Sequence, residues 1–256
     1  MKSRVCFVGD SHVAALRQAL DDPGCEQFLD RLTIFGSQGK TLDTVELVDN
    51  HIVSDEKRVR RNFKLTGGRK FIDLDAFDAF CVVGCQMEMD LVEPLYSTFA
   101  PVEMGLKRRQ PVSSALFDIM LQEIFKTTIA YKLVNMLAQS GKPVYQILNA
   151  RYSDEILEHS KGKFFQELID SGADGKFLER FRKAVDVVFG PTAIMIEQPP
   201  STFSPPMFTS PTFSSGSKRL GKGLKEHPED DFHHMNAEYG ALMLSRAFEL
   251  IDGKTK

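Results

Sequence analysis

The sequence predicts an α/β protein, a three-layer α/β/α sandwich around a central, mainly parallel five-stranded sheet. Five short apolar runs recur along the chain, and helical patterns lie between them. Short apolar runs of this length are typical of strands that are buried on both faces. Alternation of such strands with helices favours right-handed crossovers and a doubly wound sheet. We expect the strands at residues 5–8, 31–35, 79–83, 143–148 and 193–196.

The first predicted strand and the first predicted helix meet at Ser11. The apolar run Val5 to Val8 ends at a turn around Gly9, and helical spacing follows from about Val13 to Leu20. A serine at this junction has two interpretations. It is either a helix N-cap or a nucleophile whose developing oxyanion finds backbone N–H groups nearby. Taken alone, the Gly-Asp-Ser stretch favours the cap.

Between the strands the sequence predicts one hairpin and several helices. The Thr66-Gly-Gly68 stretch between residues 62–65 and 69–74 indicates an antiparallel hairpin with a glycine-rich turn. The helices are expected at 41–50 (weakly), at 115–139 up to the stop at Gly141, at 164–189 with an interruption near 171–175, and at 237–251.

Length and composition favour one globular domain. The chain has 256 residues, of which 42% are hydrophobic and 26% are charged, and α/β chains of this size often form a single domain. We therefore expect one domain over residues 1–256, with insertions near 50–75 and 94–114 and a Pro/Phe-rich loop at 199–229.

Charge and cysteine content exclude several classes of protein. A net charge of −3 gives no electrostatic reason to bind nucleic acid or an anionic membrane surface. The four cysteines, Cys6, Cys25, Cys81 and Cys85, have no zinc-ligand spacing, and we expect no disulfide framework. There is no apolar stretch of signal-peptide or membrane-spanning length. The expectation is a cytoplasmic protein with no metal and no cofactor; the oligomeric state stays open.

A low-complexity loop at residues 199–215 precedes the last helix. Its prolines prevent a helix or a central strand. Phe203, Phe208 and Phe213 recur at an interval that fits neither a helix nor a strand. Two interpretations remain open: a lid or acyl-group wall over the site, or a loop whose rings pack onto the surface.

A second polar motif lies directly before the last predicted helix. In Asp231-Phe-His-His-Met-Asn236 an aspartate stands three residues before His234. An aspartate that holds one ring nitrogen of a histidine, while the other nitrogen faces a serine, is the arrangement that nucleophilic acyl transfer needs. Together with Ser11, this motif shifts the interpretation toward a nucleophile. The doublet also allows a shift by one residue, to Asp230 and His233.

Gly-Asp-Ser near the start and Asp-x-x-His near the end resemble the SGNH (GDSL-like) hydrolase superfamily, over the whole chain. The resemblance implies a flavodoxin-like fold with Ser11 as nucleophile and Asp231 and His234 as acid and base. It implies an oxyanion hole from the N–H groups of Ser11 and Gly39 together with the side-chain amide of Gln86. Gly36 is a rival to Gly39, because both follow the same strand.

The third motif departs from the family pattern. Gln86 stands where the family has asparagine, and glutamine offers the same amide donor on one extra methylene. A misplaced donor would leave a slow enzyme or a fold whose catalysis has lapsed. His12 also replaces the commoner leucine.

The resemblance implies a serine esterase that hydrolyses a small O-acyl ester, with an acetylated carbohydrate as the expected substrate. The alternatives are a lapsed glycan- or acyl-binding module and an O-acyltransferase that uses the same triad. Asp10 is expected mainly to tie down the turn. His51, His159 and His227 are expected to be isolated and solvated. The candidates for substrate contact are Asp10, His12, Phe203, Phe208 and Phe213.

Overall fold

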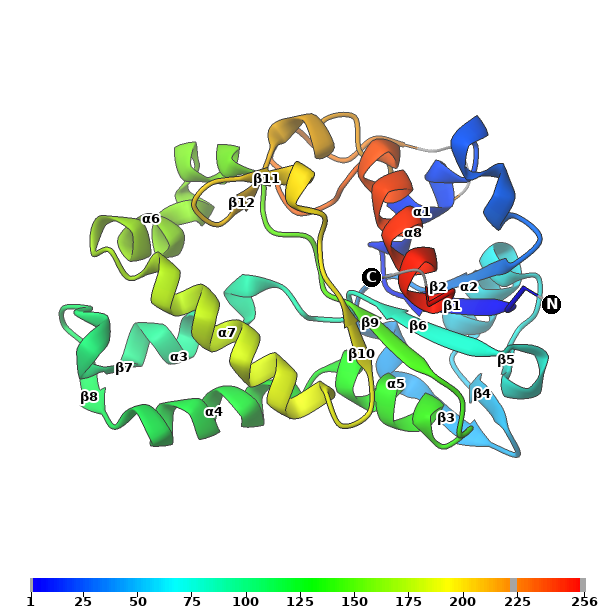
Figure 1. Cartoon of the computed structure of the whole chain (residues 1–256), viewed down its shortest axis with the longest axis horizontal. Helices are drawn as coiled ribbons and strands as arrows, with labels where there is room; N and C mark the ends of the chain where they lie inside the picture. The colour runs from blue at the N-terminus through cyan, green and yellow to red at the C-terminus, as the bar shows by residue number, and fades with distance from the viewer. Residues whose placement is uncertain (1, 222–224, 254–256) are drawn as a thin grey trace.

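A parallel five-stranded sheet lies at the centre of the computed structural model, which describes residues 2–221 and 225–253 (Figure 1). The strand order is β10-β9-β6-β1-β2, and all neighbouring pairs are parallel. This confirms the predicted α/β class. The strands are β1 (Val5–Gly9), β2 (Leu32–Gly36), β6 (Ala79–Val83), β9 (Val144–Ile147) and β10 (Ile194–Ile196).

Helices cover both faces of the sheet, because every side chain of β1 must be buried. Val5 and Phe7 pack into a cluster with α1 (Val13–Ala19) and α8 (Ala237–Ile251). Cys6 and Val8 point to the other face, which α2 (Lys57–Gly67) and α5 (Ile129–Ala138) cover. The alternation follows from the two-residue period of a strand. All four cysteines are free and buried.

A group of helices extends beyond the sheet, on the left in Figure 1. Its core is aromatic: Tyr96 packs edge-on against Phe117 and Phe177, with ring centroids 4.8 and 5.1 Å away. No helix in the described part of the chain has the length and apolarity to cross a membrane. The elements of this group are α3 (Glu93–Thr98), β7 (Phe99–Pro101), β8 (Gln110–Val112), α4 (Ser114–Lys126), α6 (Lys163–Asp170) and α7 (Asp174–Phe189).

Close contact between α1 and α8 joins the two ends of the chain. At Gly240 the backbone of α8 lies so near α1 that a Cβ atom would stand 2.1 Å from the carbonyl oxygen of Ala15. Only glycine permits this approach without a shift of one helix. The residues just before α1 and just before α8 are thereby brought side by side.

The predicted hairpin at 62–74 is wrong. Residues 57–67 form α2, whose Val59 and Phe63 are buried on one face, and Gly68 ends the helix in a left-handed conformation (φ 79°). Gly68 is the C-cap of this helix, and a glycine pair in the sequence fits a helix C-cap as well as a hairpin turn. A short strand, β5 (Ile72–Asp73), follows.

The weak helix expected at 41–50 is also wrong. A 3₁₀ segment (Gly39–Thr44) leads into an antiparallel hairpin of β3 (Val45–Val48) and β4 (His51–Ser54). Its two-residue turn is Asp49-Asn50, with φ values of 45° and 63°. Aspartate and asparagine tolerate positive φ, and such turns match the twist of a hairpin.

The single helix predicted at 115–139 is two helices, α4 and α5. Thr128 begins α5, because its hydroxyl accepts a hydrogen bond from the backbone N–H of Tyr131 (3.2 Å). The predicted interruption near 171–175 is confirmed between α6 and α7, and the last helix has its predicted bounds, 237–251.

The Pro/Phe-rich loop folds over the top of the molecule in Figure 1 as 3₁₀ turns and a small ladder of β11 (Phe203–Ser204) and β12 (Phe208–Thr209). Phe208 and Phe213 are buried, against Phe165 and Tyr239. Of the three rings only that of Phe203 is partly exposed. Residues 222–224 of the loop expected at 199–229 lie outside the described residues.

Candidate active site

The candidate site lies where β1 ends and α8 begins. Ser11 follows β1, and residues 231–236 precede α8, so the α1–α8 contact places the two polar motifs together. Asn236 secures the second motif: its side chain accepts from the N–H of Tyr239 (3.2 Å) and donates to the carbonyl oxygens of Thr212 and Ser215 (2.7 and 3.0 Å).

A chain of hydrogen bonds joins Ser11, His234 and Asp231. The Ser11 Oγ atom lies 2.8 Å from His234 Nε2, and His234 Nδ1 lies 3.0 and 2.9 Å from the two carboxylate oxygens of Asp231. An ionised carboxylate only accepts, so Nδ1 carries the ring proton and Nε2 accepts from the Ser11 hydroxyl. Ser11 is not the helix cap: His12 occupies the N-cap position of α1, without a side-chain capping bond, and the Ser11 hydroxyl faces His234.

Asp231 accepts hydrogen bonds from more groups than the ring of His234. It also accepts from the backbone N–H groups of His233 and His234 (3.3 and 3.1 Å) and from Nδ1 of His227 (2.8 Å). Burial tends to raise the pKa of Asp231, but the hydrogen bonds from His227 and His234 outweigh it and hold the pKa far below its ordinary value. Asp231 therefore stays ionised beside His234.

His227 differs from the isolated, solvated histidine that its sequence context predicts. Only 8% of its side chain is exposed, and its ring stacks on that of His234 with centroids 3.9 Å apart. Its Nε2 atom is buried without a hydrogen-bond partner in the described structure. The four-residue spacing from His227 to Asp231 was the available signal.

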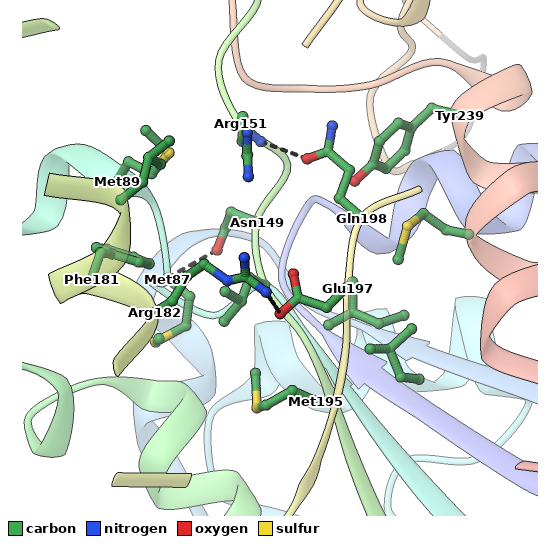
Figure 2. A pocket seen from close by; sticks show the side chains of 15 residues that line it. Met87, Met89, Asn149, Arg151, Phe181, Arg182, Met195, Glu197, Gln198 and Tyr239 are labelled. Carbon is green, nitrogen blue, oxygen red and sulfur yellow. Dashed lines mark hydrogen bonds and ion pairs between the residues drawn. The ribbon is translucent and has the colours of Figure 1, made fainter. Parts of the chain in front are cut away.

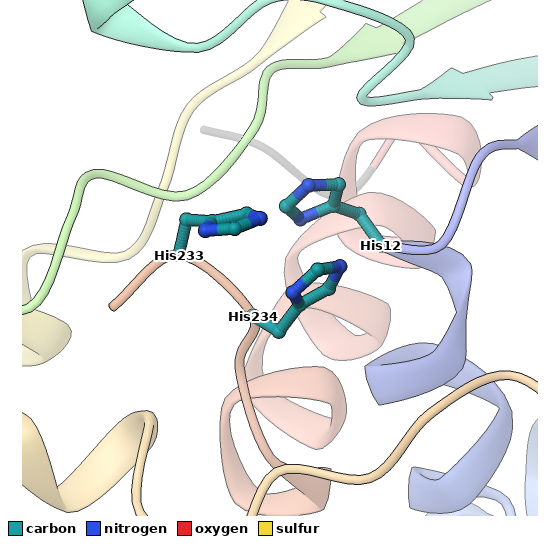
Figure 3. A group of neighbouring side chains, drawn as sticks. All are labelled: His12, His233 and His234. Carbon is teal, nitrogen blue, oxygen red and sulfur yellow. The ribbon is translucent and has the colours of Figure 1, made fainter. Parts of the chain in front are cut away.

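Two more imidazoles complete a cluster around His234 (Figure 3). His12 stacks on His234 with centroids 4.6 Å apart, and His233 lies 4.2 Å from it by the same measure. Burial, and then the nearby charge of His234, lower the pKa of His12 well below its ordinary value. The same two causes lower the pKa of His233 to about 4. Both rings are therefore neutral at pH 7.

The cluster contains groups of the kind that bind transition metals. One nitrogen each of His12, His233 and His234 lies within 4.8 Å of the others, and His227, Asp231 and His234 form a similar group. Both nitrogens of His234 are already engaged, however, by Ser11 and by Asp231. A metal at His234 would have to replace one of these two partners.

Glu88 and Asn149 extend the polar network away from Ser11, and neither was singled out in the sequence. Glu88 lies 3.8 Å from His12 Nε2 and accepts from Asn149 Nδ2 (3.1 Å). Asn149 in turn accepts from the backbone N–H of Met87 (2.9 Å). Burial, together with the charge of Asp10, raises the pKa of Glu88 to about 7.

Asp10 ties two loops together. Its carboxylate accepts from the backbone N–H groups of His12 (3.0 Å) and Cys85 (2.8 Å), and the N–H of Gln86 also faces it. Gly84, Cys85 and Gln86 all have φ values between 65° and 69°. The N–H groups of Cys85 and Gln86 turn toward the Asp10 carboxylate, whereas that of Gly84 donates to the carbonyl oxygen of Ile147 (2.9 Å). Cys85 and Gln86, which are not glycine, carry backbone strain. This arrangement agrees with the structural role expected for Asp10.

The Gln86 side chain is anchored at the start of α5. Its Oε1 atom accepts from the backbone N–H of Ile129 (3.3 Å), which leaves Nε2 as the group free to donate. Of the two rival glycines, Gly36 already donates its N–H to Thr66 Oγ1 (3.0 Å). Gly39 is exposed, with φ 59°, and nothing would contact a Cβ atom built on it.

The alternative pair, Asp230 and His233, is not brought together. Asp230 is paired with Lys161 (2.8 Å) at the surface. The Nδ1 atom of His233 lies 3.5 Å from Asp231 instead. Of the other candidates for substrate contact, His12 lies on His234, whereas Phe208 and Phe213 belong to the core and Phe203 lies under Arg151.

Comparisons with known proteins add similarities of overall structure only. No protein-family model matches the sequence, and no curated protein does. One solved structure with some similarity is a protein provisionally named an acylhydrolase from Bacteroides fragilis, with 11% identity over 98% of this chain and 87% of that chain and a TM-score of 0.39. A second is a DUF4886 family protein from Bacteroides uniformis, with 12% identity over 97% of this chain and 82% of that chain and a TM-score of 0.42. A third is LAE5, an alpha/beta hydrolase enzyme from the metagenome of Lake Arreo, Spain, with 11% identity over 98% of this chain and 95% of that chain and a TM-score of 0.39. All three TM-scores are below 0.5, so these similarities do not bear on the activity of this chain.

Proposed function

We propose that the protein is a serine esterase that hydrolyses a small O-acyl ester. The observation that supports this is the hydrogen-bonded chain from Ser11 through His234 to Asp231. The resemblance to SGNH hydrolases, carried by the motifs at Ser11 and at Asp231 and His234, leads to the substrate class: an acetyl ester on a carbohydrate.

In the acylation step, His234 Nε2 takes the hydroxyl proton as Ser11 Oγ forms a bond to the ester carbonyl carbon. The carbonyl electron pair moves onto oxygen, giving a tetrahedral oxyanion. His234 then returns the proton to the alcohol oxygen as the carbon–oxygen bond breaks, which leaves an acyl-serine. Asp231 keeps Nδ1–H oriented and stabilises the imidazolium formed between the two proton transfers.

In the deacylation step, a water molecule gives a proton to His234 and attacks the acyl-serine carbonyl. A second tetrahedral oxyanion collapses, Ser11 Oγ recovers the proton and the carboxylic acid leaves. We assign oxyanion donation to the N–H groups of Ser11 and Gly39 and to Gln86 Nε2. The bond from Ile129 to Gln86 Oε1 supports this assignment, since it holds the carboxamide by its oxygen and leaves its nitrogen as the donor.

Hydrolysis of p-nitrophenyl esters from acetyl to octanoyl tests the proposal. Wild type is compared with Ser11→Ala, His234→Ala and Asp231→Asn, each checked for folding by circular dichroism. We expect release of p-nitrophenol by wild type only, with a loss of at least about a thousandfold in each variant. Equal turnover in wild type and Ser11→Ala would refute the proposal.

Two alternatives use the same residues. A lapsed binding module is favoured by the replacement of asparagine by Gln86, and it predicts no turnover of any ester by the wild type. An O-acyltransferase differs only in that a sugar hydroxyl replaces water in deacylation. Analysis of the products with and without a sugar acceptor separates it from the esterase.

A further inference from the structure

A cleft lies beside β10, away from Ser11. It has a volume of about 600 Å³ and is bordered by α7, α8 and the start of the Pro/Phe-rich loop. A smaller hollow of about 50 Å³ adjoins it (Figure 2). Four residues line both: Arg151, Arg182, Glu197 and Gln198.

The charges on the cleft wall do not balance. Its lining carries three arginines and two glutamates. Arg182 pairs with Glu197 (3.0 Å) and Arg246 pairs with Glu249 (3.5 Å). Within residues 2–221 and 225–253 the guanidinium of Arg151 makes no hydrogen bond and no ion pair, although this residue is partly buried. Burial, and then the nearby charge of Arg182, lower the pKa of Arg151, and the charge of Glu197, already paired with Arg182, opposes this only in part.

Arg151 is held in place by contacts that leave its guanidinium unused as a donor. The guanidinium lies over the ring of Phe203, 4.1 Å from its centroid. The backbone N–H of Arg151 donates to Gln198 Oε1 (3.1 Å), and its carbonyl oxygen accepts from Thr209 Oγ1 (2.8 Å). Gln198 is itself fixed, because its Nε2 donates to Thr202 and Thr209 (2.8 Å each).

A partly buried cation without a counter-ion is costly, and a planar guanidinium matches the two oxygens of a carboxylate or phosphate. We propose that the cleft beside β10 binds an anionic ligand, a carboxylate or phosphate group on a compact organic molecule, through the guanidinium of Arg151. Phe203 supports this guanidinium and Gln198 holds the backbone of Arg151, so little ordering is needed on binding.

This site is distinct from the Ser11 site, and the proposal does not depend on the esterase. Arg151 faces the cleft, whereas the ring of the next residue, Tyr152, lies 5.9 Å from that of His233. Asn149 likewise lines the hollow and bonds to Glu88, which faces His12. The segment 149–152 thus stands between the cleft and the histidine cluster.

Isothermal titration with sodium phosphate and with sodium succinate, against sodium chloride at equal ionic strength, tests the proposal. The proteins are wild type, Arg151→Gln, Arg69→Gln and Ser11→Ala. We expect saturable binding of at least one anion by wild type and Ser11→Ala, and at least tenfold weaker binding by Arg151→Gln. We expect a change of less than threefold in Arg69→Gln, whose arginine lies outside the cleft and is paired with Asp73 (3.4 Å). Which anion binds identifies the group that the site prefers.

Two results would overturn the proposal: no saturable binding of either anion by folded wild type, or equal binding by Arg151→Gln. If Arg151→Gln does not fold, Arg151→Lys takes its place. Lysine keeps the charge but not the planar fork, and we expect at least threefold weaker binding. Anion binding is measured independently of ester hydrolysis. If an inactive Ser11→Ala, or a wild type that cleaves no ester, still binds the anion, then the anion site is supported whether or not the protein is an esterase.

Discussion

His227 and His234 share one carboxylate: their Nδ1 atoms lie 2.8 and 2.9 Å from Oδ2 of Asp231, and their rings are stacked. Two imidazole donors on one aspartate lower its basicity and fix its orientation. His227 touches neither Ser11 nor, in the proposed mechanism, the substrate. It is therefore a positioning residue for His234.

Replacing His227 by phenylalanine keeps a stacked ring and removes the donor to Asp231. We expect kcat to fall about tenfold, or ~1.4 kcal/mol, with KM nearly unchanged, because His234 is held less firmly. We also expect the pH–rate profile to shift, because the hydrogen bond from His227, the largest of the contacts that lower the pKa of Asp231, is removed. Steady-state kinetics from pH 5 to 9 measure both effects. His51→Phe, far from Asp231, is the control, and a His227→Phe variant with wild-type kcat and pH profile would contradict the assignment.

One substitution of Gln86 separates the role of its side-chain oxygen from the role of its side-chain nitrogen. Gln86→Glu keeps an oxygen for the N–H of Ile129 and removes the proposed oxyanion donor. We expect a similar melting temperature and a loss of at least about a hundredfold in kcat. Gln86→Ala should lose both the activity and the contact with α5, at a further cost of about 1 kcal/mol in unfolding free energy. Full activity in a folded Gln86→Glu would exclude Gln86 from the oxyanion hole.

The five strands of the central sheet, the last helix and the two main motifs could be predicted from local patterns. Strands buried on both faces are continuous apolar runs, and Asp231 and His234 stand three residues apart in the sequence. His227, Glu88 and Asn149 could not be found in this way, because their roles come from loops that meet only in the folded chain. The hairpin expected around Gly67 and Gly68 failed for a related reason: burial of Val59 and Phe63 decided for a helix, and glycine suits the end of either element.

Glu88 makes the stability of the protein depend on pH. Burial raises its pKa from the ordinary 4.5 to about 7, so the folded protein holds a proton that the unfolded chain releases. A raised pKa contributes stability that is present below pH 4.5 and is lost as the pH rises through 7. At most about 3 kcal/mol is involved. Glu88→Gln should therefore gain stability relative to wild type between pH 4.5 and pH 8.

Urea unfolding of both proteins at pH 4.5, 6 and 8 measures this difference directly. The comparison with wild type cancels contributions from the histidines. Glu46→Gln, at an exposed position of β3, should show no such trend. A constant difference between Glu88→Gln and wild type across the three pH values would mean that Glu88 ionises freely in the folded protein.

The histidine cluster allows a test that separates a serine esterase from a metal-dependent hydrolase. We expect activity to survive dialysis against EDTA. We expect excess Zn²⁺ to inhibit, because imidazole nitrogens of His12, His233 and His234 lie close enough to bind it, and His234 would then be lost as a base. Mg²⁺, which prefers oxygen ligands, should have no effect. His233→Ala should remain active and resist Zn²⁺ better than wild type. Activity lost with EDTA and restored by Zn²⁺ would instead make the cluster a metal centre.

Gly240 links the packing of two helices to the geometry of the site. In Gly240→Ala the new Cβ atom would stand 2.1 Å from the Ala15 carbonyl oxygen, so α8 must move away from α1. We expect a loss of about 1–3 kcal/mol in unfolding free energy. His234 lies just before α8 and Ser11 lies just before α1, so a shift of α8 changes the distance between these two side chains. We therefore also expect kcat to fall at least tenfold in protein that is still folded. Gly175→Ala in α7, where a Cβ atom meets open space, is the matched control and should change the unfolding free energy by less than about 1 kcal/mol. If Gly240→Ala lost stability but kept full kcat at a temperature where it is folded, the distance between Ser11 and His234 would not depend on the contact between these helices.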